Sequence, residues 1–185
     1  MLTDLLKELE VNMQKAVDSL KREYGTLRAG RANPALLEKI SVEYYGTFTP
    51  INQMSNISAP EPRLLVIQPW DRSIIGAIEK AILKSDLGLT PSNDSTLIRI
   101  SIPQLTKERR TELVKVVKKK AEEFKIEIRN LRRDANDSVK KMEREYGISE
   151  DDSRKTLEQV QKVTDKYIER IDKVMANKEA EVLEV

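Results

Sequence analysis

The sequence predicts an α+β fold: a long antiparallel three-helix bundle with a smaller inserted β/α/β domain, joined to it by a two-strand hinge. Three long segments carry apolar residues at intervals of three and four, the spacing of a helix with one buried side. Residues 31 to 105 differ, because prolines and runs of β-branched residues gather there. Charged residues make up 35% of the chain and aromatic residues 4%, a balance typical of long solvated helices.

The first helix is expected from residue 2 to about residue 28, and Gly30 and Pro34 would end it. Its apolar stripe comprises Leu2, Leu6, Leu9, Met13, Ala16, Leu20, Tyr24 and Leu27. The second helix is expected to start at Thr106, a candidate N-cap, and to be longer than the first. Its stripe comprises Val114, Val117, Ala121, Phe124, Ile128, Leu131, Ala135, Ser138 and Met142.

The third helix follows a break at residues 146 to 147. Ser149 and Asp152, three residues apart, resemble a capping box at its start. Its stripe comprises Leu157, Val160, Thr164, Tyr167, Ile171 and Val174. Because each stripe needs a partner surface, the three helices are expected to share one core.

The inserted segment contains three β-branched runs that predict strands, at residues 40 to 45, 64 to 68 and 96 to 102. A helix is expected between the last two, with Asp71 or Ser73 as its N-cap and an end near Gly88. Trp70, just before this helix, is interpreted as a packing residue. Together these elements predict a compact α/β unit.

The chain passes twice between the bundle and the inserted unit, so the sequence predicts a discontinuous bundle domain at 1–29 and 106–185 and an inserted domain at 30–105. Two short linkers favour a hinge, although a rigid interdomain interface is an equally good interpretation. The hinge residues would be Ala29, Gly30, Arg31, Pro103, Gln104 and Leu105.

Composition argues against an enzyme. The chain has no cysteine and no histidine, which removes thiolate chemistry and the commonest general base and metal ligand. There is no phosphate-binding loop motif, and the acidic residues 150 to 152 are better explained by a helix N-terminus than by a metal site. We therefore expect no catalytic residues, no cofactor and no metal. No apolar run approaches the roughly 18 residues that span a membrane, and the N-terminus is not signal-like, so a cytoplasmic location without membrane contact is expected.

Charge is distributed unevenly along the chain. The total is 33 basic and 31 acidic residues, but residues 106 to 141 hold 13 basic and 7 acidic residues, 13 − 7 = +6. Within this helix Arg129, Arg132 and Arg133 stand at i, i+3 and i+4, where like charges repel. One explanation is a solvated helix whose charges pair with neighbouring helices. The other is a stripe that binds the phosphates of structured RNA.

Several segments resemble the bacterial ribosome recycling factor family, in the same order and over essentially the whole chain. They are RAGRANPALL (28 to 37), VEYYGT (42 to 47), WDRSIIGAIEKAI (70 to 82), SDLGLTP (85 to 91), LTKERR (105 to 110), RNLRRDAND (129 to 137) and ISEDD (148 to 152).

Nothing in the sequence indicates obligate oligomerisation, so a monomer is expected, and the resemblance implies that the protein is not an enzyme. It would bind large-subunit ribosomal RNA in the intersubunit space. With elongation factor G and GTP it would split the post-termination ribosome into subunits, freeing messenger RNA and deacylated transfer RNA. By this likeness Arg28, Arg129 and Arg132 contact the RNA, and the spacing of Arg133 adds it to the set. The alternative from another class is a helical scaffold that binds a protein through its acidic third helix or an exposed seam.

Overall fold

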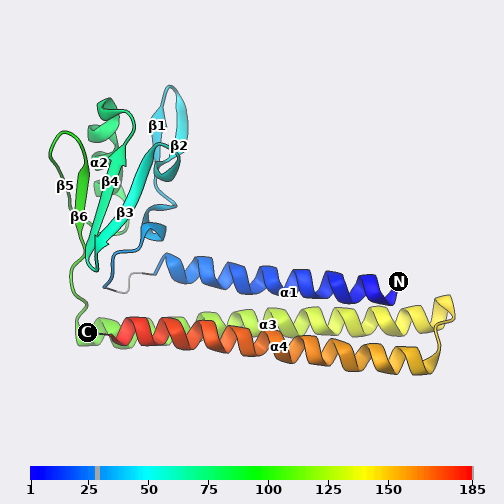
Figure 1. Ribbon diagram of the computed structural model, residues 1–185. Coiled ribbons are helices and arrows are strands. Elements are labelled where there is room, and N and C mark those ends of the chain that lie inside the picture. The colour runs from blue at the N-terminus through cyan, green and yellow to red at the C-terminus, as the bar shows by residue number, and fades with distance from the viewer. Residues whose placement is uncertain (28–29, 185) are drawn as a thin grey trace. The chain divides into compact units, whose positions relative to one another are not determined.

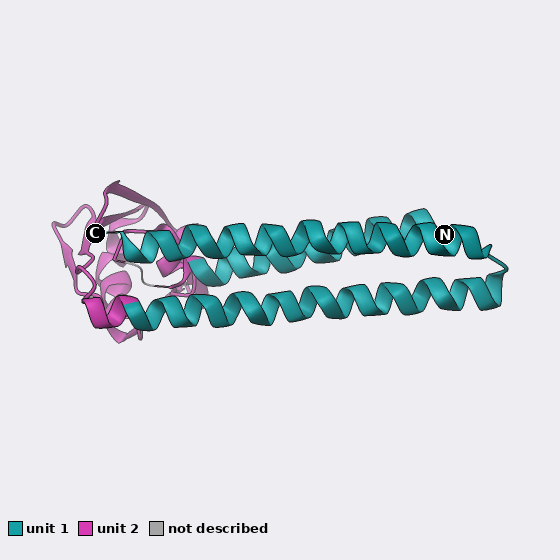
Figure 2. Cartoon of the chain, turned by 90° about the horizontal axis from the view of Figure 1, so that it is seen from below, with its two compact units in different colours: residues 1–24, 111–185 teal, residues 25–110 magenta. Residues whose placement is uncertain are grey.

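The computed structural model describes residues 1–27 and 30–184, which separate into two compact units (Figure 2). The first unit comprises residues 1–24 and 111–185, and the second comprises residues 25–110. The sequence placed these boundaries after residue 29 and before residue 106, whereas the units divide after Tyr24 and after Arg110. Arg28 and Ala29, predicted as an RNA contact and a hinge residue, lie outside the described residues.

The first unit is a bundle of three long helices, α1 (Leu2–Gly25), α3 (Lys107–Tyr146) and α4 (Glu150–Leu183). The last residue of α1 and the first four residues of α3 are assigned to the second unit. The three helices lie side by side, with α3 antiparallel to the other two (Figures 1 and 2). The 40 residues of α3 give it a length of about 60 Å at the usual rise per residue. The predicted antiparallel three-helix bundle is confirmed.

The buried residues of the bundle follow the predicted stripes, with some exceptions. The buried apolar residues are Leu9, Met13, Ala16, Val17, Leu20, Tyr24, Leu113, Val117, Ala121, Ile128, Ala135, Val139, Val160, Tyr167, Ile171 and Val182. In α4, Thr156 is buried and Leu157 only partly so, contrary to the prediction. The Thr156 hydroxyl donates a 2.8 Å hydrogen bond to the carbonyl of Asp152, which lets a polar residue occupy the core.

The second unit contains two antiparallel sheets and one α-helix (Figure 1). A two-stranded sheet pairs β1 (Ser41–Tyr44) with β2 (Thr47–Pro50). A four-stranded sheet has the order β3-β4-β6-β5, with bounds Ser55–Glu61, Leu64–Pro69, Ile98–Ser101 and Pro91–Asn93. The helix α2 (Ile75–Lys84) follows β4, and short 3₁₀ turns occupy Pro34–Leu37, Ile51–Gln53 and Arg72–Ile74.

The sequence predicted β1, β4 and β6 but missed β2, β3 and β5. The two central strands of the larger sheet are among those predicted, whereas the missed β3 and β5 are its edges. Edge strands carry few inward apolar residues: β3 is largely exposed and includes Pro60, and β5 is three residues long. A search for alternating or β-branched runs therefore finds the centre of such a sheet and not its margins.

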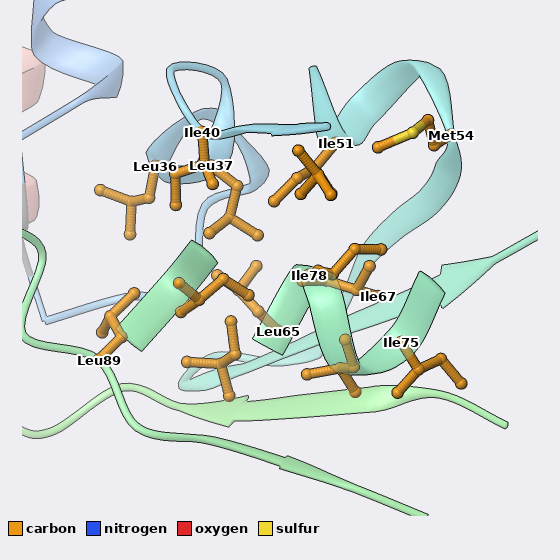
Figure 3. Packing of buried hydrophobic residues seen from close by; sticks show 14 of the residues in the cluster. Leu36, Leu37, Ile40, Ile51, Met54, Leu65, Ile67, Ile75, Ile78 and Leu89 are labelled. Carbon is orange, nitrogen blue, oxygen red and sulfur yellow. The ribbon is translucent and has the colours of Figure 1, made fainter. Parts of the chain in front are cut away.

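The second unit has a hydrophobic core of its own, between α2, the larger sheet and the segment that precedes β1 (Figure 3). Its buried residues are Leu36, Leu37, Ile40, Val42, Ile51, Met54, Leu65, Ile67, Ile74, Ile75, Ile78, Ile82, Leu89, Ile98, Ile100 and Ile102. Inward residues alternate along β4 and β6, as the period of a strand requires. The unit thus buries apolar surface independently of the helices of the bundle.

The prediction that Trp70 is a packing residue is wrong, because Trp70 is 73% exposed. The alternation of β4 explains this position: Leu65, Ile67 and Pro69 face the core, so residue 70 falls on the outer side. Asp71, one of the two predicted N-caps, caps the 3₁₀ turn that leads into α2, where its carboxylate accepts a 2.9 Å hydrogen bond from the Ser73 amide. The N-cap position of α2 itself is Ile74, which has no capping side chain.

Candidate nucleic-acid interface

The predicted RNA contacts that the structure describes lie on α3. We call Arg129, Arg132 and Arg133 the arginine cluster. Between Lys107 and Tyr146 the helix contains neither proline nor glycine and is rich in Lys, Glu, Arg and Ala, so its backbone is regular through the cluster. Spacings of three and four residues place all three side chains on neighbouring rows of one helix surface. That surface borders α4, because the side chain of Arg132 reaches Gln161 of α4.

Arg129 has an acidic partner on its own helix. Its Nη1 lies 3.1 Å from Oε1 of Glu122, seven residues earlier and therefore two turns away. No acidic residue lies three or four positions from Arg129 in the sequence. The partner was missed because two long side chains together span two turns.

Arg132 is half-buried between α3 and α4 and makes one hydrogen bond within the described chain, from Nη1 to Oε1 of Gln161 at 3.4 Å. This distance is long for a hydrogen bond, so the contact is weak. Its Nε atom is buried without a hydrogen-bond partner. No carboxylate of the described residues is bound to Arg132, so its charge has no acidic partner there.

Arg133 is exposed to solvent. Asp137, one turn further along α3, stands where it could pair with Arg133, but within the described part of the chain Arg133 forms neither an ion pair nor a side-chain hydrogen bond. Arg133 is thus the second member of the arginine cluster whose charge has no acidic partner.

Two other cations on the same side of α3 are neutralised by α4. Lys118 Nζ lies 3.7 Å from Oε1 of Glu179, and Lys125 Nζ lies 2.5 Å from Oδ1 of Asp172. Pairing between helices therefore accounts for Lys118 and Lys125. It does not account for Arg132 and Arg133, for which the RNA-binding explanation stays a prediction.

Gln161 on α4 was missed by the sequence analysis, although it contacts Arg132. Its amide nitrogen donates a 2.9 Å hydrogen bond to Oδ1 of Asp165 on the same helix. A glutamine in an acidic, solvated helix gives no local signal of such a role. Only the register between α3 and α4 brings it to Arg132.

The described residues of the predicted hinge belong to the second unit. Gly30 has a φ of +74°, a conformation that favours glycine, and a Cβ atom there would lie 3.3 Å from Cγ of Leu105. The two linkers thus approach each other at Gly30 and Leu105. Beside them, the Ala32 amide donates to the Pro62 carbonyl at 2.7 Å, and the Ile102 amide donates to the Arg63 carbonyl at 2.8 Å.

Two further findings concern metal ions and membranes, and both refer to residues 1–27 and 30–184. No group of acidic side chains in this part of the chain could hold a metal ion. None of the helices described has the length and apolar character needed to cross a membrane.

Comparison with known proteins gives a consistent result. A family model for ribosome recycling factor matches residues 20–183. The chain is similar to the ribosome-recycling factor of Moorella thermoacetica, with 64% identity over 185 residues covering 100% of both chains. The corresponding protein of Heliobacterium modesticaldum is 61% identical over 185 residues, with the same coverage.

Two solved structures are similar to the whole chain. A solution structure of ribosome recycling factor has a TM-score of 0.78 and 47% identity, covering 100% of this chain and 98% of the other. The second comes from models of the T. thermophilus ribosome recycling factor and the E. coli elongation factor G bound to the E. coli post-termination complex. Its TM-score is 0.70 and its identity 46%, with 100% of both chains covered.

Proposed function

The chain belongs to the ribosome recycling factor family, and from this premise we propose that it recycles ribosomes after translation termination. With elongation factor G and GTP it splits the post-termination ribosome into subunits and frees messenger RNA and deacylated transfer RNA. Similarity over the full chain supports this function, as does a structural neighbour placed with elongation factor G on a post-termination complex. The protein works in the cytoplasm as a monomer.

The arginine cluster is the proposed contact with large-subunit ribosomal RNA in the intersubunit space, together with Arg28. The observation that carries this proposal is the difference between cations on α3: Lys118 and Lys125 pair with carboxylates of α4, whereas Arg132 and Arg133 have no acidic partner in the described chain. A guanidinium group binds phosphate oxygens through two parallel hydrogen bonds, which makes arginine well suited to this contact. Phosphate binding would also offset the repulsion within the cluster.

The role of the protein in subunit splitting is mechanical. GTP hydrolysis belongs to elongation factor G, and this chain contributes binding surfaces and no reacting groups. The hinge residues Ala29, Gly30, Arg31, Pro103, Gln104 and Leu105 let the second unit move when elongation factor G acts on it. The left-handed backbone of Gly30, beside Leu105, supports a role for Gly30 in this hinge.

Light scattering of post-termination ribosomes tests the function directly. The ribosomes are mixed with this protein, elongation factor G and GTP, and each component is omitted in turn. A fall in scattering that requires all three additions is expected, because subunits scatter less than whole ribosomes. The proposal fails if scattering stays constant with the cognate elongation factor G while a known recycling factor splits the same ribosomes with its own factor.

A further inference from the structure

Two ion pairs between α3 and α4 form a regular ladder. Lys118 pairs with Glu179 and Lys125 pairs with Asp172. The two cations are seven residues apart, and so are the two acids, in the opposite direction along the chain. This is the repeat expected of two antiparallel helices that pack with a heptad period.

The next step of the ladder would pair Arg132 on α3 with Asp165 on α4. Arg132 lies seven residues after Lys125, and Asp165 lies seven residues before Asp172. Here the repeat is broken, because Gln161 lies between the two charges. Its carbonyl oxygen accepts from Nη1 of Arg132 at 3.4 Å, and its amide nitrogen donates to Oδ1 of Asp165 at 2.9 Å. In place of an ion pair, the third step is a chain of two hydrogen bonds through a neutral amide.

This arrangement leaves the charge of Arg132 available. The amide oxygen orients the guanidinium group but carries no net charge, so it does not neutralise Arg132. The amide nitrogen meanwhile donates to Oδ1 of Asp165, the carboxylate that stands at this step of the ladder. A hydrogen bond of 3.4 Å is weak, whereas one between a guanidinium group and a phosphate is short and charge-assisted. An incoming phosphate can therefore replace Gln161 at little cost.

We propose that Gln161 is a positioning residue that keeps Arg132 from pairing with Asp165 and so holds its guanidinium group ready for a phosphate. This inference rests on the proposed function, in which Arg132 contacts ribosomal RNA. It predicts that removal of Gln161 harms ribosome binding through Asp165, and that Gln161 contributes no contact of its own to the ribosome.

The test is a double-mutant cycle on ribosome affinity with the full-length chain. Gln161→Ala frees Asp165 to pair with Arg132, and affinity is expected to fall about two- to fivefold, the factor that an exposed ion pair corresponds to. The double variant Gln161→Ala with Asp165→Asn is expected to bind within about twofold of the parent, because the competing carboxylate is gone. Thermal unfolding of each variant verifies that the bundle is folded.

Glu158→Gln is the matched control: Glu158 is exposed, lies seven residues before Asp165 on the same side of α4, and forms no ion pair with the described residues, so its removal frees no cation of α3. It corrects for the general gain in affinity when negative charge is removed near RNA, and Asp165→Asn alone should resemble it. The inference is wrong if Gln161→Ala lowers the affinity and adding Asp165→Asn does not restore it. It is also wrong if Gln161→Ala leaves the affinity unchanged. Arg132→Ala distinguishes a failure of the Gln161 inference from a failure of the proposed RNA contact. If this variant binds ribosomes as the parent does, the RNA contact of Arg132 itself is wrong.

Discussion

At the level of single residues, the cations of α3 differ in what surrounds them. Glu122, Asp172 and Glu179 take up the charges of Arg129, Lys125 and Lys118. Within the described chain, the polar partner of the Arg132 side chain is the amide oxygen of Gln161, and Arg133 is exposed to solvent. Exposed ion pairs such as Arg129–Glu122 add at most about 1 kcal/mol to stability.

Arg132→Ala is expected to leave the protein folded but to weaken ribosome binding by at least about 1 kcal/mol, roughly fivefold, because a charge-assisted hydrogen bond to phosphate is lost. Sedimentation of the protein with ribosomes measures the change. Arg22→Ala, which removes an exposed arginine from α1, is the control and should bind as the parent does. The dependence of affinity on salt should become shallower only in Arg132→Ala, and unchanged affinity in that variant would remove Arg132 from the interface.

Asp94 offers a prediction about pH. Its carboxylate accepts hydrogen bonds from the Thr96 hydroxyl at 2.7 Å, from the amides of Thr96 and Leu97 at 3.1 Å each, and from Arg99 at 2.8 Å. These contacts, led by the Thr96 hydroxyl, lower the pKa of Asp94 well below its usual range. A carboxyl group whose pKa is lower in the folded state stabilises the protein above its unfolded pKa, about 4, and loses this contribution as the pH falls.

Asp94→Asn should therefore unfold at a lower temperature than the parent at pH 7, and the difference should shrink as the pH falls below about 4. Circular dichroism melts over this pH range measure it. Thr96→Val, which removes one of the donors, should give a smaller loss at pH 7. A difference that stays constant with pH would show that the ionised carboxylate is not what stabilises the turn.

At the level of elements, the start of α4 combines an N-cap with the acidic run at 150 to 152. The Ser149 hydroxyl accepts a 3.1 Å hydrogen bond from the Asp152 amide, as the sequence predicted. Glu150, Asp151 and Asp152 occupy the first turn, where the helix dipole favours negative charge. Before it, Gly147 supplies a φ of +67° in the turn from α3.

Ser149→Ala is expected to destabilise the bundle by about 1 kcal/mol, because the N-cap hydrogen bond is lost. Denaturant unfolding followed by helical circular dichroism measures the free energy. Ser149→Asp is the matched control, since aspartate also caps helices, and it should keep most of the stability. Equal stability of the alanine and parent proteins would mean that solvent replaces the cap without cost.

At the level of the whole molecule, each of the two units has its own hydrophobic core. The second unit is inserted into the chain of the first, yet its buried residues belong to its own strands, α2 and the segment before β1. A defect in one core is therefore expected to act mainly on the unit that contains it.

Leu65→Ala is the test, because Leu65 is fully buried in the second unit. The substitution should destabilise this unit by about 2 to 5 kcal/mol through lost burial and the cavity left behind. Amide hydrogen exchange should rise within residues 30–106 and stay unchanged in the bundle helices. A parallel rise in α3 and α4 would show that the two units unfold together.

The sequence by itself determined the elements whose pattern is local. Apolar spacing defined the three helices of the bundle, β-branched runs located the two central strands of the larger sheet, and the spacing of Arg129, Arg132 and Arg133 put them on one side of α3. Ordered motifs along the whole chain identified the family. Each of these features is a pattern within one segment, so the residue types and their spacing there are enough to predict burial or charge.

Only the tertiary structure decided which charges remain unpaired. The partners of Lys118, Lys125 and Arg132 lie on α4, and a shift of the register between the two helices would give each cation a different neighbour. The edge strands β3 and β5 and the exposed position of Trp70 were likewise not predicted. In each case the outcome depends on contacts between segments distant in sequence or on the side of a strand that faces the core, and neither is encoded in a local repeat.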